Sequence, residues 1–232
     1  MNNLLEVNDV YKSLKGKHIL NGINLSLQKG RVLGIMGPNA QGKTTLLNTI
    51  QGFLKVDKGD IKLDGISINS ETKNHIAFLQ DRNIFNKTMK IKDAINLYAD
   101  FFDDFDKEKM KYYLDFMNLD DKSRIKELSK GMSEKLSLSL TLSRKAKLYM
   151  LDEPISGVDP VSREKILDAI LENLSEESSM IITTHYIGEL ERIFDEVAFL
   201  GEGKIIEYGD AEELRERYKA SVDEIYRKIF TE

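Results

Sequence analysis

Alternating hydrophobic and polar residues dominate the first part of the chain. The stretches LLEVNDVY and HILNGINLSL, between Leu4 and Leu27, alternate in this way on either side of the polar segment KSLKGK, which predicts antiparallel strands. Lys29-Gly30 then leads into RVLGIM, a short apolar run typical of a buried strand. A helix is predicted from about Lys43 to Gln51, and GDIKLDGISI predicts a hairpin with Asp64-Gly65 at its turn.

The second part of the chain alternates between apolar runs and helical patterns. NHIAFLQ predicts a further strand, and apolar residues from roughly Ile91 to Met117 follow helical spacing. AKLYMLDEP and SMIITTH are apolar runs that end in polar residues, with helix-like segments beside them, as in a parallel sheet with crossover helices. VAFLGEGKIIEYG predicts a hairpin, after which Asp210 is placed to cap a helix that begins AEELRERY. The chain is therefore predicted to have an α/β fold.

The stretch LSLSLTL can be interpreted in two ways. Leu136, Leu138, Leu140 and Leu142 alternate with Ser and Thr, which is the pattern of a half-buried strand. On a helix, at about 100° per residue, the same leucines would lie on two nearly opposite faces. Such a helix would be buried on two sides, and the pattern alone leaves both structures open.

A phosphate-binding loop connects the strand RVLGIM to the helix that begins TTLLNTIQ. Residues 37–44 read GPNAQGKT and match G-x-x-x-x-G-K-S/T in the strand-to-helix context that this pattern requires. The glycines would let successive N–H groups approach the β-phosphate, with the positive end of the next helix behind them. Lys43 would neutralise the β- and γ-phosphates, Thr44 would ligate Mg²⁺ and Thr45 would reach the α-phosphate. The residues predicted to bind the nucleoside triphosphate are Gly37, Pro38, Asn39, Ala40, Gln41, Gly42, Lys43, Thr44 and Thr45.

Two acidic residues and a histidine follow the apolar strands beside this loop. Asp152 ends one strand, and an aspartate at the carboxyl end of a parallel strand next to a phosphate loop can hold Mg²⁺. Glu153 would point the other way along the pleat and polarise the attacking water. His185 follows SMIITT and would donate a hydrogen bond to the γ-phosphate. Taken alone, an Asp-Glu turn or a lone histidine is usually structural; beside the loop, Lys43, Glu153 and His185 are predicted to be catalytic.

Composition and charge exclude several classes of protein. Hydrophobic residues make up 41% and charged residues 31% of the chain, which is ordinary for a globular protein. The net charge of −5 argues against a broad nucleic-acid interface. The absence of cysteine excludes disulfides and thiolate metal sites and fits a cytosolic protein. The sequence shows no signal peptide and no run near the roughly 20 apolar residues of a membrane-spanning helix, so any membrane function is expected to depend on another chain.

Several motifs in a fixed order give the chain a family resemblance. After the phosphate loop come LSKGM at 128–132, LDEP at 151–154, SGVDP at 156–160 and TTH at 183–185. In this order they resemble the ATP-binding subunit of an ABC transporter, most closely the exporter (ABC-2) type. LSKGM is the most specific of them, because it stands where that family carries its signature, usually LSGGQ. The resemblance covers nearly the whole chain and implies a phosphate-loop NTPase core, an antiparallel β subdomain and an inserted α-helical subdomain.

The resemblance implies roles for residues that the other patterns leave unassigned. Ser129 and Gly131 would contact the γ-phosphate of ATP held by a second subunit, with the N-terminus of the following helix aimed at it. Asp159 would communicate across that dimer. Because a helix follows the signature in this family, LSLSLTL is expected to be a helix. ATP would lie between two such chains arranged head to tail.

The third metal-binding position has two candidates. Gln80 is predicted to sense Mg²⁺ beside the metal ligands Thr44 and Asp152 when the position is counted back from Phe85. Counting forward from Ile76 gives Asp81 instead. Gln80 is preferred for its side-chain chemistry.

Other positions depart from the family pattern. Ala40 replaces a usual glycine in the phosphate loop, which is tolerable at negative φ and costs stability otherwise. Lys130 and Met132 replace Gly and Gln in the signature. The position that usually stacks an aromatic ring on adenine falls at Leu14, with Tyr11 three residues earlier, so adenine stacking stays open.

The chain is expected to be a single ABC ATPase domain over residues 1–232. Its antiparallel β subdomain is predicted at 1–30 and 56–70, and its helical subdomain, including the signature, at 82–140. By resemblance, the segment between Gln80 and Leu128 would dock on a membrane partner. The aromatic residues that would join this surface or pack inside the subdomain are Tyr98, Phe101, Phe102 and Phe105.

Three functions compete for this set of motifs. The first is a transporter motor that binds ATP and Mg²⁺, dimerises with a second ATP-binding subunit and drives export through separate transmembrane permease subunits at the cytoplasmic face of the cell membrane. The second is an ABC ATPase acting on a ribosome or DNA complex; such relatives usually join two ATP-binding domains or carry a long coiled-coil insertion, and 232 residues without a basic tract accommodate neither. The third, a small-molecule kinase, has no use for LSKGM or SGVDP. The motor is therefore predicted, without a nucleic-acid partner; its substrate is not specified, because the membrane subunits select it.

Overall fold

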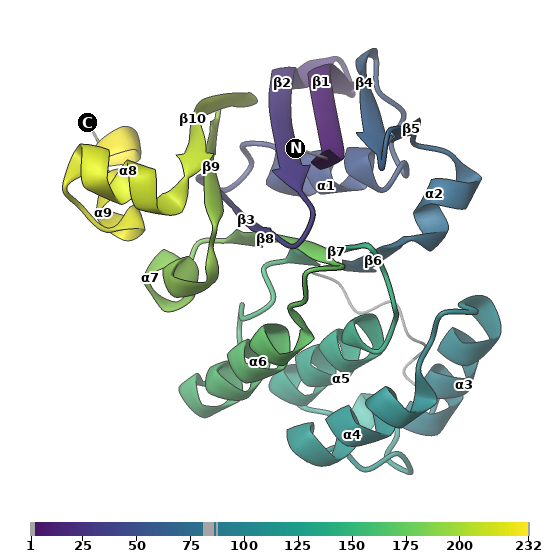
Figure 1. The fold of residues 1–232 in the computed structure, drawn as a ribbon. Coiled ribbons are helices and arrows are strands. Elements are labelled where there is room, and N and C mark those ends of the chain that lie inside the picture. The colour runs from purple at the N-terminus through teal and green to yellow at the C-terminus, as the bar shows by residue number, and fades with distance from the viewer. Residues whose placement is uncertain (1–2, 81–85, 87, 232) are drawn as a thin grey trace.

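The computed structural model describes residues 3–80, 86 and 88–231 (Figure 1). Its strands are β1 (Asn3–Leu14), β2 (Lys17–Gln28), β3 (Val32–Met36), β4 (Lys58–Leu63), β5 (Ile66–Ser67), β6 (Ile76–Leu79), β7 (Leu148–Asp152), β8 (Ser179–Thr184), β9 (Glu196–Gly201) and β10 (Lys204–Asp210). Its α-helices are α1 (Lys43–Ile50), α2 (Ser70–Asn74), α3 (Ile91–Phe101), α4 (Lys107–Met117), α5 (Lys130–Leu142), α6 (Pro160–Asn173), α7 (Ile187–Leu190), α8 (Ala211–Tyr218) and α9 (Val222–Thr231), and short 3₁₀ turns cover Ile125–Glu127 and Glu191–Ile193.

Two sheets organise the part of the chain that the structure describes. The strand order β2-β1-β4-β5 forms an antiparallel sheet, and β10-β9-β3-β8-β7-β6 forms a mixed sheet in which the strands from β9 to β6 are parallel. In Figure 1 the antiparallel sheet lies above the mixed sheet, and helices α3 to α6 lie below it. The predicted α/β fold is confirmed, while the exact subdomain boundaries stay predictions.

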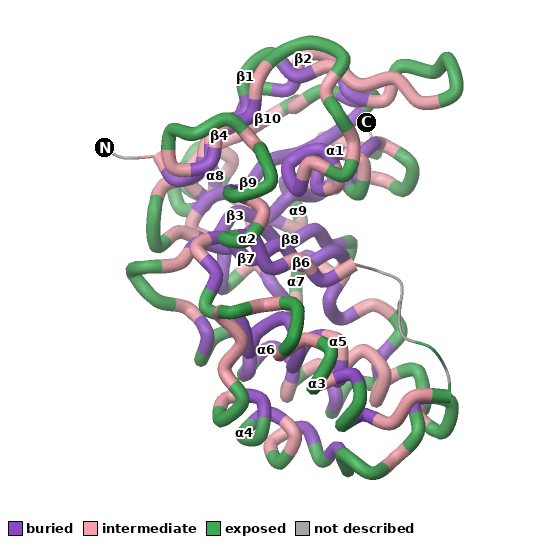
Figure 2. The backbone as a smooth tube through the Cα atoms, turned by 90° about the vertical axis from the view of Figure 1, so that its right-hand side faces the viewer, coloured by how far each residue is buried: buried purple, intermediate pink, exposed green. Residues whose placement is uncertain are grey.

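The central strand β3 is buried on both faces because each face meets a separate hydrophobic core. Leu33 and Ile35 pack with α1 and the antiparallel sheet, whereas Val32 and Met36 pack with the helices on the other side. Figure 2 shows the buried backbone concentrated in these central strands. A strand covered on both faces has no polar alternation, which explains the continuous apolar run RVLGIM.

Helix α1 fills the space between the two sheets. Leu46, Leu47 and Ile50 are fully buried and share one cluster with residues of both sheets. Because α1 begins directly after the phosphate loop, its burial fixes the loop at the carboxyl end of β3. Burying three such side chains contributes several kcal/mol, at about 1.5–3 kcal/mol each.

The leucine-rich stretch forms helix α5, as expected from the family resemblance. Its four leucines at alternate positions are all fully buried. The hydroxyls of Ser139 and Thr141 between them donate to the carbonyls of Lys135 and Ser137, at 2.7 and 2.9 Å. These local bonds let small polar residues lie in a buried helix. The period of two therefore reflects burial on two flanks.

The region from Ile91 to Met117 forms two helices, α3 and α4, where the pattern predicted one helical stretch. Asp106 separates them, since its Oδ1 accepts a hydrogen bond from the N–H of Lys109 at 3.0 Å and caps α4. Tyr98 packs on Phe102 and Phe105, with ring centroids 5.2 and 5.9 Å apart. The fourth aromatic residue, Phe101, is 74% exposed. Packing within the helical layer is thus confirmed for three of the four rings.

The C-terminal part of the described chain follows the predicted pattern. β9 and β10 form the expected hairpin. Asp210 caps α8 and accepts hydrogen bonds from the N–H groups of Glu212 and Glu213 at 2.9 and 3.2 Å. None of the helices in residues 3–80, 86 and 88–231 has the length and apolar character to span a bilayer.

Candidate active site

The phosphate loop follows β3 and ends at the first turn of α1. A Cβ at Gly37 would collide with the carbonyl oxygen of Leu200, and Gly42 has a φ of 108°. Both positions therefore require glycine. The Oε1 of Gln41 accepts a hydrogen bond from the N–H of Glu202 at 2.5 Å, which ties the loop to the turn between β9 and β10.

Ala40 adopts the left-handed backbone conformation, with a φ of 64°. Alanine in place of the usual glycine therefore costs stability at this position, because a Cβ in the left-handed region costs about 1–2 kcal/mol. Ala40 is exposed, so the methyl group gains little packing in return. Strain of this kind is common at functional loops.

The ammonium group of Lys43 is enclosed by the loop. Its Nζ donates to the carbonyl oxygens of Gly37 and Pro38, at 2.7 and 3.3 Å, and lies 3.9 Å from Oε1 of Glu153. Burial lowers the pKa of Lys43, and the negative charges of Glu153 and Asp152 partly offset this effect. A desolvated cation beside a helix N-terminus is suited to bind a phosphate group.

Asp152 joins the loop to the neighbouring strand β8. Its Oδ2 accepts a hydrogen bond from Thr44 Oγ1 at 2.8 Å, and its Oδ1 accepts one from Thr183 Oγ1 at 2.5 Å. Asp152 is only 2% exposed. Thr183 is not among the predicted site residues; the sequence signal for it is its place directly before Thr184-His185, and its register pairs it with Asp152.

Glu153 and His185 are in direct contact. The Oε2 of Glu153 lies 2.7 Å from Nδ1 of His185 and accepts the backbone N–H of His185 at 3.3 Å. Because a carboxylate only accepts, Nδ1 carries the proton in this contact. Glu153 has a φ of 53°, and its N–H donates to the carbonyl and hydroxyl of Thr183 at 3.1 and 3.2 Å. The strained backbone thus directs the carboxylate toward Lys43 and His185.

Gln80 lies at the same edge of the mixed sheet. It follows β6 directly, and Leu79 pairs with Leu151, so the register brings Gln80 level with Asp152. The alternative position, Asp81, lies outside the described residues. Gln80 as the metal-sensing residue stays a prediction.

The signature lies on the other side of the mixed sheet from the phosphate loop of the same chain. Ser129 is exposed and caps α5, since its Oγ accepts the N–H of Met132 at 3.2 Å. Figure 1 shows α5 below this sheet and α1 above it. Ser129 is therefore separated from Lys43, although both belong to the predicted ATP site.

Gly131 and Asp159 are close neighbours. A Cβ at Gly131 would lie 3.8 Å from Oδ2 of Asp159. Asp159 caps α6 by accepting the N–H of Ser162 at 3.0 Å, and the hydrogen bonds from Ser162 lower the pKa of Asp159. The signature residue Lys130 lies against Gly157, where a Cβ would collide with its side chain. The signature and the SGVDP segment thus form one surface.

The residues considered for adenine stacking lie on the antiparallel sheet. The ammonium of Lys58 lies 4.8 Å from the ring centroid of Tyr11, so stacking by Tyr11 would compete with this cation–π contact. Leu14 ends β1. Neither residue is assigned to adenine.

Comparison with known proteins identifies the family. The family model described as "ABC transporter" matches residues 20–156, which is more than half of the chain. The ABC transporter ATP-binding protein YtrB of Bacillus subtilis is 28% identical over 93% of this chain and 75% of its own length. The lantibiotic transport ATP-binding protein SrtF of Streptococcus pyogenes is 27% identical over 94% of this chain and 97% of its own length.

A solved structure shows the same fold. The ATP-binding subunit of an ABC transporter aligns with a TM-score of 0.87 and 22% identity, over 97% of this chain and 98% of the other. The phosphate loop, Asp152, Glu153 and His185 meet at the carboxyl edge of this fold, where α/β proteins bind their ligands. With a family model that spans the loop and both acidic residues, the chain belongs to the ABC transporter family as an ATP-binding subunit, and it is an ATPase.

Proposed function

We propose that the chain is the motor of an exporter: two copies, or this chain and a close relative, close head to tail around two ATP molecules and drive separate permease subunits from the cytoplasmic face of the membrane. One observation carries the proposal. Glu153 is held between His185 and Lys43, beside the Asp152–Thr44 pair. A positioned base, a phosphate-binding cation and a pair of metal-binding oxygens are the groups that ATP hydrolysis requires.

The phosphate loop would bind the triphosphate through its backbone. Gly42 and Lys43 begin the first turn of α1, where N–H groups without helical partners point out of the helix. Lys43 would exchange its bonds to the loop carbonyls for the β- and γ-phosphates. Thr45, in the same turn, would reach the α-phosphate. Pro38, Asn39, Ala40 and Gln41 would shape the loop around it.

Thr44 and Asp152 would hold Mg²⁺. Their oxygens are already 2.8 Å apart, and hydroxyl and carboxylate oxygens are the donors that this ion prefers. Within the described residues no group of three or more His, Cys, Asp or Glu could hold a metal by itself. This donor set fits an ion that takes its other ligands from phosphates and water, and Gln80 would join them. Bound Mg²⁺ would neutralise charge on the phosphates.

Glu153 would act as the general base. The ring and the backbone N–H of His185 hold the carboxylate, which can then take a proton from water in line with the γ-phosphate. With Nδ1 on Glu153, the ring of His185 can donate from Nε2 to a phosphate only when it is doubly protonated. Otherwise the contact with Glu153 must break, so these two residues are coupled.

The head-to-tail arrangement would complete the site. Ser129 and Gly131 lie at the start of α5, away from the Lys43 loop of the same chain. A second chain could place this helix N-terminus on the γ-phosphate. Asp159 adjoins Gly131 and would carry the contact across the interface. The geometry therefore favours a site shared between two chains.

The export direction is supported by SrtF, whose name refers to lantibiotic transport. Phe101 is an exposed aromatic residue on α3, within the segment that would contact a permease. Isolating the chain from native membranes tests this part of the proposal. Recovery with a membrane protein that lacks an ATPase domain supports the motor, and recovery with ribosomes alone supports the alternative of an ABC switch.

Glu153→Gln tests the catalytic assignment. The variant should bind ATP and Mg²⁺, form a stable dimer and hydrolyse ATP about 10²–10⁴-fold more slowly, because the base is lost while the phosphate contacts remain. Light scattering and phosphate release measure the two effects. Glu164→Gln, at an exposed position on α6, is the matched control and should behave like the parent. A Glu153→Gln chain that stays monomeric at saturating ATP and Mg²⁺ would contradict the head-to-tail site.

A further inference from the structure

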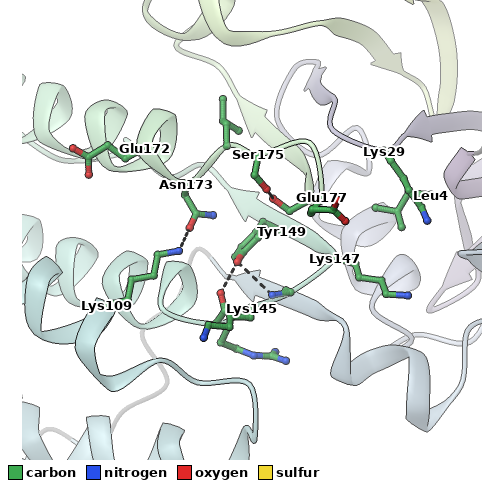
Figure 3. A pocket seen from close by; sticks show the side chains of 14 residues that line it. Leu4, Lys29, Lys109, Lys145, Lys147, Tyr149, Glu172, Asn173, Ser175 and Glu177 are labelled. Carbon is green, nitrogen blue, oxygen red and sulfur yellow. Dashed lines mark hydrogen bonds between the residues drawn. The ribbon is translucent and has the colours of Figure 1, made fainter.

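A second cavity lies at the opposite edge of the mixed sheet from the phosphate loop. Its volume is about 480 Å³, within the range of roughly 300–1,000 Å³ that small-molecule sites occupy. The walls come from the turn before β3, the loop before β7, the end of α6 with the turn before β8, and helix α4 (Figure 3). The cavity thus joins the helical layer to the amino ends of the parallel strands.

Cations dominate the wall, and one of them forms no ion pair within the part of the chain that the structure describes. Lysine or arginine side chains line the cavity at positions 29, 109, 144, 145 and 147. Lys29 and Lys147 share the carboxylate of Asp64, while the cations at 144 and 145 pair with separate aspartates. Among the ion pairs of the described residues, none within 4.0 Å includes Lys109.

The ammonium of Lys109 is held by an amide. Its Nζ donates to Oδ1 of Asn173 at 2.5 Å. Burial lowers the pKa of Lys109, and the charge of Asp106 partly offsets this effect. An amide oxygen carries no net charge, so the cation is desolvated without full compensation. An anion in the cavity would supply the negative charge that Lys109 lacks.

The other end of the same amide is a donor without an acceptor. Because Oδ1 of Asn173 faces the ammonium, Nδ2 is turned to the other side, toward Tyr149 (Figure 3). Asn173 is only 6% exposed, and its Nδ2 finds no hydrogen-bond partner among the described residues. The hydroxyl of Tyr149 donates to the carbonyl of Arg144 at 2.5 Å and accepts the N–H of Ala146 at 3.3 Å. Burial raises the pKa of Tyr149 and a polar contact with Asn173 partly offsets this effect, but that contact does not reach hydrogen-bond geometry for Nδ2. An unsatisfied buried donor costs about 1–3 kcal/mol.

The two carboxylates that line the cavity, Glu172 and Glu177, are not directed toward Lys109. Both oxygens of Glu172 accept the hydroxyl of Tyr112, at 3.1 and 2.9 Å. Glu177 lies on the side of Leu4 and Lys29, away from Lys109 (Figure 3). The end of the cavity at Lys109 and Asn173 is therefore electropositive.

We propose that this cavity binds a small phosphate-bearing molecule, with the phosphate beside the hydrogen-bonded pair Lys109 and Asn173. One phosphate would give the ammonium of Lys109 a counter-ion and the amide of Asn173 an acceptor. A tetrahedral anion can do both, because its oxygens point toward both groups at once. Leu4, Leu174 and the ring of Tyr149 line the same cavity and can contact an organic group. This site is distinct from the triphosphate site and does not depend on the proposed export function.

Calorimetric titration tests the site in a Lys43→Ala background, which removes the phosphate-binding cation of the loop and so weakens phosphate binding there. Inorganic phosphate should bind this chain at one site. Adding Lys109→Gln should weaken binding about tenfold or more, because a charge-assisted bond is lost while glutamine can still donate to Asn173. Glycerol 3-phosphate binding more tightly than inorganic phosphate identifies an organic ligand, and equal affinity identifies free phosphate.

Asn173→Asp separates a binding defect from a folding defect. It keeps the volume and the contact with Lys109, but it replaces the free donor by a carboxylate oxygen that repels an anion. Phosphate binding should be lost while the melting temperature is kept or raised. The proposal is overturned if the Lys43→Ala chain binds no phosphate, if both added variants bind it as tightly as their parent, or if acetate binds as tightly as phosphate.

Discussion

Lys43 is buried and Lys109 is partly buried, at opposite edges of the mixed sheet, and loss of solvation lowers the pKa of both. At the carboxyl edge, Lys43 has Glu153 at 3.9 Å and Asp152 nearby. At the amino edge, the ammonium of Lys109 has, among the described residues, only the amide of Asn173 as a hydrogen-bond acceptor. The same type of side chain is thus charge-compensated at one edge and left to attract an anion at the other. The difference arises because carboxylates lie at the carboxyl end of β7 next to Lys43, whereas Lys109 meets an amide where α4 packs on α6.

The largest expected effect separates these two lysines in catalysis. Lys43→Ala should reduce ATP hydrolysis by about 10²–10³-fold or more, since the loss of one preorganised donor to the transition state costs that much. Lys109→Gln should hydrolyse ATP within about threefold of the parent, because Lys109 lies at the other edge of the sheet. Steady-state phosphate release at saturating ATP measures both. Equal losses of ATP hydrolysis in the two variants would contradict the assignment of catalysis to the carboxyl edge alone.

The second effect concerns stability at the amino edge. Arg144 bonds Asp104 at 2.9 Å and the carbonyl of Ile76 at 2.7 Å, and is 4% exposed. Arg144→Ala should lower the free energy of unfolding by about 3 kcal/mol, because it leaves the buried carbonyl of Ile76 and the partly buried Asp104 without their cation. Lys145→Ala removes the adjacent, exposed cation and should cost less than about 1 kcal/mol. Urea unfolding compares the two variants. Similar losses of unfolding free energy would mean that Arg144 does not anchor the wall of the second cavity.

The third effect depends on pH. The hydrogen bonds from Lys147 and Lys29 lower the pKa of Asp64, so its contribution to stability is present above the unfolded pKa of roughly 4 and is lost as the pH falls below it. Asp64→Asn keeps a residue that tolerates the turn, and it should cost less than about 1 kcal/mol at neutral pH and nothing in strong acid. Urea unfolding across this pH range measures the difference. A difference that grows on acidification would contradict this sign.

The same variant sharpens the comparison of the two edges. Asp64→Asn frees Lys29 and Lys147 from their shared counter-ion, so phosphate should bind the second cavity more tightly than in the parent. The affinity of the phosphate loop should not change.

The smallest effect concerns strain in the phosphate loop. Ala40→Gly relieves a φ of 64° but adds freedom to the unfolded chain, so a net gain of about 0.5 kcal/mol is expected. Ala99→Gly, in the last turn of α3, should instead cost up to about 1 kcal/mol. Denaturant midpoints distinguish opposite signs. If Ala40→Gly instead lowered the free energy of unfolding, the methyl group of Ala40 would have to contribute stabilising contacts despite its exposure.

The fold class and most residues of the carboxyl edge could be predicted from the amino-acid sequence. The phosphate loop, Asp152-Glu153 and His185 are encoded in contiguous motifs behind apolar strands, and parallel strands necessarily bring their carboxyl ends to one edge. The capping role of Asp210 and the Asp64-Gly65 turn were also predictable, because local backbone hydrogen bonds depend on neighbours in sequence. Helix α5 could be predicted only with the family resemblance, because a helix buried on two flanks has hydrophobic residues at the same period of two as a strand.

Other features of the molecule depend on contacts between elements that are distant in the chain. Thr183 became a site residue through the register of β7 and β8, and the left-handed conformation of Ala40 depends on how the loop is held between β3 and α1. The second cavity has no sequence motif, because Lys109 and Asn173 are distant in the chain and meet where α4 packs on α6. Burial and missing counter-ions arise from packing between elements, and a linear pattern of residues does not encode them.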